Sequence, residues 1–413
     1  MPIFKPFRGI RPQENFVDCF PTHPLDNFTQ VEINKKAQED FSYVQMIKPY
    51  VCSRSKDLDR NLRKIRTNFE ELVSENKLMQ DPSSYYLYEQ IYPNKRVFRG
   101  LLGLVSVEDF VAGKIKKHES TIPKKKAKLA HYLDKVNLQA EPVLLTYPSN
   151  SKVELLMNHE EKNLPILSYE DSKGIKHKLW RIDNRLRMQQ FKEVIEGIEA
   201  FYIADGHHRI GSTALNAKLH KEKNKKHTGL EHYNFVYSFI VSNQSIKIND
   251  FNRMITNLHG LSSAEFLKKL EASFTIFDKG ETPYFPSKKF HISMYLDGKF
   301  YSLHVKHELR SEEIDINHLD HHLLDKLIFK NIFEIENTDD SDEISYVRGT
   351  STVEGIINLK NAVENGNFAA GFGVYPVSFN EIIKISDNRI TMPPKCTYIE
   401  PKLITALLMY DMK

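Results

Sequence analysis

The sequence has 413 residues, of which 40% are hydrophobic and 11% aromatic, so it can bury the cores of two or three domains. Its formal net charge is +4, from 58 Lys and Arg against 54 Asp and Glu, which argues against a dedicated nucleic-acid binder. The mean hydropathy is −0.47, and the sequence shows no long apolar run and no signal peptide. We therefore expect a soluble, cytoplasmic protein with no membrane partner.

The three cysteines are Cys19, Cys52 and Cys396. Their odd number and wide spacing exclude a disulfide framework, and the absence of a CxxC pair excludes a zinc ribbon.

Hydrophobic periodicity in the first 250 residues predicts helices and strands in alternation. The predicted elements are a helix at 56–79, strands at 99–107 and 142–147, a helix at 185–196, a strand at 200–204, a helix from there to about 220, and a strand at 235–241. Two stretches remain without an element: a basic one from Lys114 to His131, and a polar one at 148–178 that reads as an insertion or a hairpin.

The pattern changes at about residue 250, which predicts a second domain. Its predicted elements are helices at 263–272 and 317–332 and strands near 290–296, 299–305, 368–378 and 382–386. The fold class expected is mixed α/β (α+β), with an N-terminal segment at 1–94 packed on a core at 95–248, whose insertion lies at about 148–178, and a C-terminal α+β domain at 249–413.

The best candidate for chemistry is the strand-to-helix junction Asp205-Gly206-His207-His208-Arg209. The start of a helix exposes unpaired backbone N–H groups, Gly206 permits a tight turn, and Arg209 adds a cationic fork. The two histidines could donate or shuttle protons. The simpler alternative is an Asp cap with two incidental histidines, but the whole motif after a buried strand favours a phosphate site.

A second candidate is the segment KKHEST, in which Glu119 is preceded by His118 and by Lys114, Lys116 and Lys117. A carboxylate among these cations can stay ionised and act as a general base beside a polyanion. The alternative, which composition alone favours, is a Glu at a helix start on a solvated basic face.

A third candidate is the closing segment MPPKCTYIEPK, where Lys395, Thr397, Glu400 and Lys402 alternate along a Pro-rich stretch. It could close over a ligand, or it could be an edge strand with surface ion pairs. The histidines His318 and His322 share a helix face, but the leucines around them favour a core helix over a metal site. No Walker P-loop, Rossmann fingerprint or GxSxG motif is present.

The pair KKHEST and IADGHHR resembles the ParB/sulfiredoxin superfamily, and specifically the SerK-type free-serine kinases and the related bacterial domain-of-unknown-function family 1015. The segments FRGIRP, RGLLGLVSVEDF and MPPKCTYIEPK, and the pair Asn252 and Arg253, resemble this bacterial family along nearly the whole chain. The tryptophan that follows DGHHR in the kinases is Ile210 here.

The resemblance implies a ParB/sulfiredoxin-like core and a phosphotransferase that uses Mg²⁺ with ATP or ADP and acts on free L-serine or a similar small hydroxyl compound, in either direction. By resemblance, Glu119, Asp205 and His207 are catalytic, Gly206, His207, His208 and Arg209 bind phosphate, and the protein itself holds no further metal. The remaining candidate ligand contacts are Lys117, His118, Thr121, Arg253, Lys395, Thr397, Glu400 and Lys402.

Two alternatives stay open at this point. A nucleotide-binding regulatory switch of the ParB type would need no small acceptor. A DNA-binding adaptor is disfavoured by the near-neutral charge and by the lack of a helix-turn-helix pattern.

Overall fold

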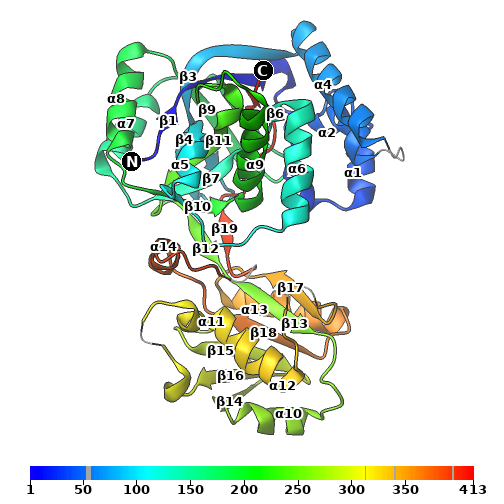
Figure 1. Ribbon diagram of the computed structural model, residues 1–413. Coiled ribbons are helices and arrows are strands. Elements are labelled where there is room, and N and C mark those ends of the chain that lie inside the picture. The colour runs from blue at the N-terminus through cyan, green and yellow to red at the C-terminus, as the bar shows by residue number, and fades with distance from the viewer. Residues whose placement is uncertain (53–56, 312, 339–340, 393–394) are drawn as a thin grey trace. The chain divides into compact units, whose positions relative to one another are not determined.

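The computed structural model describes residues 1–52, 57–311, 313–338, 341–392 and 395–413. It divides into two compact units (Figure 1). The first unit comprises residues 1–116, 121–246 and 401–413, and the second comprises residues 117–120 and 247–400. The predicted mixed α/β class is confirmed, because each unit combines helices with a sheet.

The first unit is built on a large mixed sheet with the strand order β5-β10-β7-β11-β4-β3-β9-β8, to which β1 and β2 add at β4 and β3. Its strands are β1 (Phe4–Lys5), β2 (Phe7–Pro12), β3 (Leu78–Ile91), β4 (Val97–Ser106), β5 (Ile115–Lys116), β7 (Val143–Tyr147), β8 (Leu167–Glu170), β9 (Lys176–Ile182), β10 (Phe201–Asp205) and β11 (Phe235–Ser242). A separate short pair joins β6 (Leu138–Gln139) and β20 (Tyr410–Asp411).

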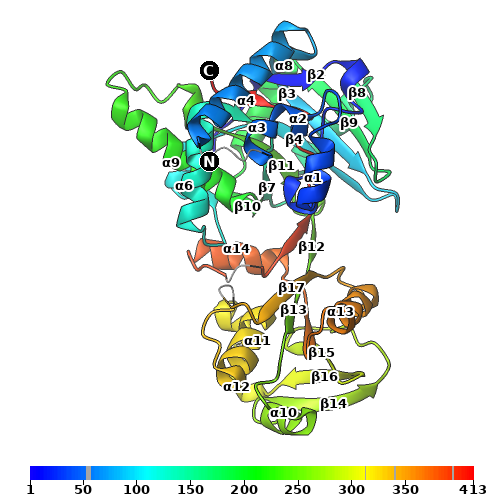
Figure 2. The ribbon, with the colours of Figure 1, turned by 90° about the vertical axis from the view of Figure 1, so that its right-hand side faces the viewer.

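The helices of this unit are α1 (Gln30–Lys36), α2 (Tyr43–Met46), α3 (Lys48–Val51), α4 (Leu58–Ser74), α5 (Val107–Val111), α6 (Pro123–Val136), α7 (Ser151–Glu160), α8 (Arg185–Glu196) and α9 (His207–Lys223). One hydrophobic core joins the sheet to α7, α8 and α9. A second core joins α2, α4 and α6 to β2, β3 and β6 and to the C-terminal residues Ala406 and Met409. Helices α6 and α9 lie side by side in both views (Figures 1 and 2).

The second unit contains an antiparallel sheet with the order β14-β16-β15-β18-β13-β17. Its strands are β13 (Phe251–Ile255), β14 (Phe274–Gly280), β15 (His291–Leu296), β16 (Lys299–Val305), β17 (Ile344–Arg348) and β18 (Ala370–Val374), and a two-stranded ribbon joins β12 (Lys247–Asn249) to β19 (Tyr398–Glu400). Its helices are α10 (Ser263–Leu270), α11 (Asp320–Leu324), the π-helix η6 (Asp325–Lys330), α12 (Asn331–Phe333), α13 (Val353–Asn365) and α14 (Phe379–Asp387). Short 3-10 helices in the two units are η1 (Glu14–Phe16), η2 (Leu25–Asn27), η3 (His232–Asn234), η4 (His307–Leu309) and η5 (Ile316–His318).

Alternate residues along these strands explain why both faces of the second sheet are covered. Met294 faces a core with α10, α11 and η6, whereas its neighbour Tyr295 faces a smaller core with α13.

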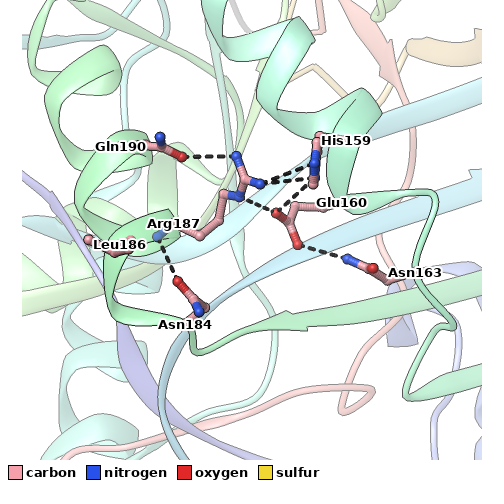
Figure 3. Close-up of a pocket in the computed structure, with 7 residues that line it drawn as sticks. All are labelled: His159, Glu160, Asn163, Asn184, Leu186, Arg187 and Gln190. Atoms are coloured by element: carbon pink, nitrogen blue, oxygen red, sulfur yellow. Dashed lines mark hydrogen bonds and ion pairs between the residues drawn. The ribbon is translucent and has the colours of Figure 1, made fainter.

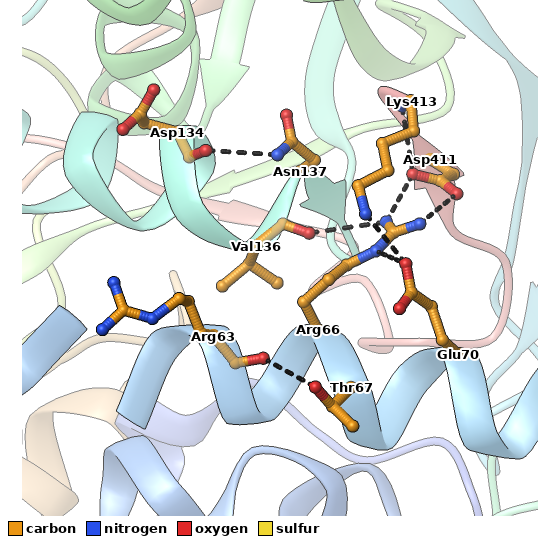
Figure 4. A network of polar contacts seen from close by, with 9 residues as sticks. All are labelled: Arg63, Arg66, Thr67, Glu70, Asp134, Val136, Asn137, Asp411 and Lys413. Atoms are coloured by element: carbon orange, nitrogen blue, oxygen red, sulfur yellow. Dashed lines mark hydrogen bonds and ion pairs between the residues drawn. The ribbon is translucent and has the colours of Figure 1, made fainter. Parts of the chain in front are cut away.

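The C-terminal residues 401–413 were expected to belong to the C-terminal domain. They lie in the first unit, where β20 pairs with β6. Arg66 of α4 binds both carboxylate oxygens of Asp411 at 2.6 and 3.0 Å and also contacts Glu70, which Lys413 binds in turn (Figure 4). Burial of this arginine makes the contact specific, because its charge needs these partners.

One predicted element was wrong. The expected strand at 382–386 is part of α14, because Ser378 and Glu381 form a capping box that starts a helix with Ile382 and Ile385 buried. The helix expected around 317–332 is confirmed, although it begins at Asp320 and includes a π-helical stretch from Asp325. In addition, the basic stretch contains α6 and the polar stretch contains α7, two helices that were not predicted. The end of the polar stretch agrees with the hairpin expected there, because β8 pairs antiparallel with β9. Among the described residues, no helix is both long and apolar enough to cross a bilayer.

Candidate functional site

The predicted phosphate motif lies at the turn between β10 and α9 in the first unit. β10 is a buried strand between β7 and β5, and Gly206 follows it with φ of 98°. A Cβ at Gly206 would lie 2.8 Å from Nε of Arg209. This close approach and the positive φ together require glycine here, so the backbone can present the start of α9 to a ligand.

Charged side chains at this turn are paired with one another. Nη2 of Arg209 donates to Asp205 at 2.6 Å, and Arg209 also forms an ion pair with Glu141. Lys402 donates to the other oxygen of Asp205 at 2.9 Å. Two cations therefore face two carboxylates, and their charges cancel.

Some donors at the turn have no partner among the described residues. Nε of Arg209 and Nδ1 of His208 are buried without a hydrogen bond there. Burial, and then the charge of Lys125, lower the pKa of His208 below its usual value, so its imidazole is neutral at pH 7 and can donate from one nitrogen and accept at the other. His207 is itself buried at 6% exposure.

Glu119 lies in the second unit, in the short segment 117–120. The segment is fixed there by a 2.7 Å hydrogen bond from the Met392 amide to the carbonyl of His118, and Glu119 forms a parallel bridge with Met392. The His118 side chain is completely buried, whereas Glu119 is partly exposed. The carboxylate is thus carried on an anchored backbone, as a positioned base requires.

Arg253, a predicted ligand contact, is completely buried in the second unit. Its Nε lies 2.9 Å from a carboxylate oxygen of Asp325. Burial raises the pKa of the Cys396 thiol to about 12, and the charges of Arg253, Asp325 and Glu119 also act on this thiol. Cys396 is therefore a neutral thiol at pH 7.

The closing segment is divided between the two units. Lys395, Thr397 and Glu400 belong to the second, and Lys402 belongs to the first. Lys395 is exposed, with Nζ 5.3 Å from the centre of the Phe251 ring. Lys402 contacts Asp205, 197 positions away in sequence.

The predicted residues thus form two groups. The first unit holds Thr121, Asp205, Gly206, His207, His208, Arg209 and Lys402, and the second holds Lys117, His118, Glu119, Arg253, Lys395, Thr397 and Glu400.

Sequence reasoning missed two features of the site. Glu141 was not predicted, although it precedes the strand at 142–147 and pairs with Arg209. The predicted lysine cluster at 114–117 is also not a single group, because Lys114 binds Asp109 at 2.8 Å and Lys116 lies over the Tyr202 ring. Two lysines of α6, a helix that was not predicted, act on α9 instead: Lys126 lies beside Gly211, and the charge of Lys125 contributes to lowering the pKa of His208.

The alternative metal site at the histidines near residue 320 does not assemble. Outside the gaps at 53–56, 312, 339–340 and 393–394, no group of three or more His, Cys, Asp or Glu side chains is arranged to hold a metal. Nδ1 of His318 contacts the Ser311 carbonyl, and Asp320 and His321 are completely buried.

A pocket of about 370 Å³ lies at α7 and α8 (Figure 3). Arg187 projects into it and contacts Glu160, His159 and Gln190. None of the predicted site residues lines this pocket, and its one arginine is already neutralised by Glu160.

Comparisons with known proteins bear on the family of the chain. No curated protein matches the chain. Similar solved structures include a free serine kinase in complex with AMP, at 12% identity and a TM-score of 0.37, over 74% of this chain and 91% of that one. A conserved hypothetical protein from Pyrococcus furiosus has 12% identity and a TM-score of 0.36, over 74% of this chain and 94% of that one. C-terminally truncated SbnI from Staphylococcus aureus has 14% identity and a TM-score of 0.37, over 74% of this chain and 87% of that one.

These similarities are too low to carry a functional argument, so the residues of the chain must carry it. The family is a separate matter. The profile described as "Protein of unknown function (DUF1015)" matches residues 4–323. Because the match covers well over half of the 413 residues, the chain belongs to the DUF1015 family, as its motifs predicted.

Proposed function

We propose that this protein transfers a phosphoryl group between a nucleotide and the hydroxyl group of free L-serine or a similar small hydroxyl compound. The observation that carries the proposal is the turn at Gly206, where a buried strand delivers uncapped N–H groups, Arg209 and His208 to one place. Such a turn suits a phosphate group because it offers several fixed donors at the positive end of a helix.

Glu119 is the base in this proposal. It would accept the proton of the acceptor hydroxyl while that oxygen forms a bond to phosphorus and the bond from phosphorus to the nucleotide oxygen breaks. The donors at the start of α9 would hold the phosphates and offset charge in the transition state. The reverse reaction would return the proton from Glu119 to the serine oxygen.

The resemblance implies Mg²⁺ with the nucleotide, and the residues at the turn fit this ion. Asp205 and Glu141 both place carboxylates beside Arg209, and Mg²⁺ prefers oxygen ligands. These two carboxylates would hold the ion together with phosphate oxygens. When bound, it would reduce the negative charge that the attacking oxygen meets.

Phosphorus NMR of the purified full chain with Mg²⁺ tests the proposal. L-Serine is offered with ATP and with ADP, and O-phosphoserine is offered with ADP and with AMP. We expect a phosphoserine resonance to appear in one of the first two mixtures, or to disappear in one of the last two. The productive pair identifies the nucleotide.

The regulatory switch gives a different result in the same experiment. It would bind or slowly hydrolyse the nucleotide at a rate that does not depend on serine. That outcome would replace the transferase by the switch.

A further inference from the structure

Helices α6 and α9 start at the same end of the first unit and run side by side in the same direction (Figure 2). Near their starts, a Cβ placed on Gly211 of α9 would lie 3.4 Å from Cδ of Lys126 and 3.7 Å from Cγ2 of Thr121. Near their ends, Asp134 of α6 lies 3.1 Å from His220 of α9. The positive ends of two helix dipoles therefore lie together beside the DGHHR turn.

The residue that precedes each helix makes no side-chain hydrogen bond to the first turn. The residue before α6 is Ile122, which has no polar side chain, and Pro123 occupies the first position of the helix. The residue before α9 is Gly206. Neither helix thus has the Ser, Thr, Asp or Asn that usually precedes a helix and whose side chain accepts from a first-turn N–H group.

The charges of the turn itself do not attract an anion. Arg209 and Lys402 are balanced by Asp205 and Glu141. An anionic ligand with several charges needs net positive charge nearby, so that charge must come from another element.

Helix α6 supplies it. Lys126 lies against the first turns of α9, and the charge of Lys125 acts on His208. Both lysines belong to the run Lys124–Lys126 at the start of α6, and neither forms an ion pair with a carboxylate of the residues that the structure describes.

We propose that Lys125 and Lys126 form the second half of the phosphate site, so that the paired starts of α6 and α9 together bind the polyphosphate chain of a nucleoside di- or triphosphate. This proposal rests on the proposed function and assigns phosphate binding to α6, in addition to the turn. Packed helices lie about 8–10 Å apart, so a ligand with two or more phosphates spans both starts better than a single phosphate does.

The proposal predicts that Lys125 and Lys126 contribute more to the affinity for the second phosphate of a ligand than to the affinity for the first. We compare wild type, the double variant Lys125→Gln/Lys126→Gln and the control Lys128→Gln by titration calorimetry. Lys128 is on the same helix, but its Nζ lies 5.3 Å from the Tyr50 ring, over α3. The probes are ADP, AMP and inorganic pyrophosphate, each with the full-length chain at two salt concentrations.

The double variant should bind ADP and pyrophosphate about tenfold or more weakly, since two charge-assisted contacts are lost. AMP should be affected less, the salt dependence of ADP binding should fall, and Lys128→Gln should bind as wild type does. Trp180 fluorescence and circular dichroism check that all variants are folded.

Equal affinities in wild type and the double variant, or equal losses in the double variant and Lys128→Gln, would overturn the proposal. If wild type binds ADP through these lysines but transfers no phosphoryl group to serine, the α6 site stands and the serine transferase fails. If wild type binds none of the three probes, both fail.

Discussion

Charged side chains at the turn at Gly206 in the first unit are partly exposed, whereas charged side chains in the interior of the second unit are buried. At the turn, the side chains of Asp205 and Arg209 are paired but remain 37% and 23% exposed. In the second unit, the Arg253 side chain is 0% exposed and depends on Asp325, and Asp320 is fully buried with one carboxylate oxygen lacking a hydrogen bond among the described residues. A partly exposed, balanced cluster can exchange partners with a ligand at low cost, whereas a buried charge cannot.

Because of this difference, we expect substitutions in the two regions to affect different quantities, ligand affinity in one and stability in the other. Variants at the turn should change ligand affinity, and variants at the buried charges should change the stability of the second unit. Glu119 differs from both, because it is partly exposed but lies on an anchored segment of the second unit.

The largest expected effect is on turnover. Glu119→Gln should reduce phosphoryl transfer about 10²–10⁴-fold, since the amide cannot accept the hydroxyl proton. Affinity for ADP should stay near that of wild type, because the proposed phosphate contacts belong to the first unit. Single-turnover transfer and calorimetry measure the two quantities. Unchanged turnover would remove Glu119 from the mechanism.

Breaking the buried ion pair should have the next largest effect. Asp325→Ala leaves the buried Arg253 charge without this partner and should destabilise the second unit by about 3–5 kcal/mol. Hydrogen exchange of peptides from 247–400, followed by mass spectrometry, measures it. The first unit contains Trp180, and its unfolding, followed by Trp180 fluorescence, should be the same as in wild type.

The matched control is Glu336→Ala, in the same unit. Its ion pair with Lys330 has a distance of 2.7 Å, but the two side chains are 75% and 53% exposed, so the loss should be at most about 1 kcal/mol. Equal effects of the two variants would contradict the distinction between buried and exposed charge.

The pH dependence of the second unit provides a third prediction. Burial raises the pKa of Asp320 to about 7 from 3.8, against the opposing effects of Lys289, the Phe290 amide and Arg310 and with the help of Glu381. Because the folded-state pKa is the higher one, this carboxyl contributes full stability below about pH 4 and loses it as the pH rises to 7. Between pH 5 and pH 8 the loss should be about 2–3 kcal/mol.

Asp320→Asn should remove this slope, because the amide does not ionise and still accepts the hydrogen bond from Phe290. The exposed Asp278→Asn should leave it unchanged. Hydrogen exchange of the second unit at pH 5, 6.5 and 8, corrected for the intrinsic exchange rate, gives the slope. A wild-type slope that persists in Asp320→Asn would assign the titration to another group.

The smallest effect on stability is expected at two glycines with positive φ. Gly206→Ala and Gly229→Ala should each cost about 1–2 kcal/mol for the left-handed backbone. No atom lies within 4 Å of a Cβ at Gly229, whereas a Cβ at Gly206 would displace Arg209. Only Gly206→Ala should therefore weaken ADP binding, as titration calorimetry would show. Equal binding by both variants would argue against the turn as a phosphate site.

Several local elements were predictable from the sequence. The helix at Arg185–Glu196 has the predicted bounds, and the predicted strand and helix around DGHHR are observed as β10 and α9. These elements depend on signals within a few residues, such as apolar periodicity and the glycine between strand and helix.

Helix α6 and helix α14 show where such reasoning fails. The lysines of α6 mask its apolar residues Ala130, Leu133 and Val136, which are buried only in the folded unit. In α14, the isoleucines favour a strand locally, but a capping box and a face packed on the unit select a helix.

The sequence by itself determined the family, the mixed α/β class and the strand–glycine–helix geometry of the candidate phosphate motif, because these follow from short motifs and patterns of residues that are neighbours in the chain. Only the tertiary structure decided that Glu141 and Lys402 balance the motif, that Arg253 is buried against Asp325, and that α6 starts beside α9. The physical reason is that these arrangements bring together residues that lie from 68 positions apart in the sequence, for Glu141 and Arg209, to 197 positions apart, for Asp205 and Lys402. No local propensity encodes which distant side chain will neutralise a charge.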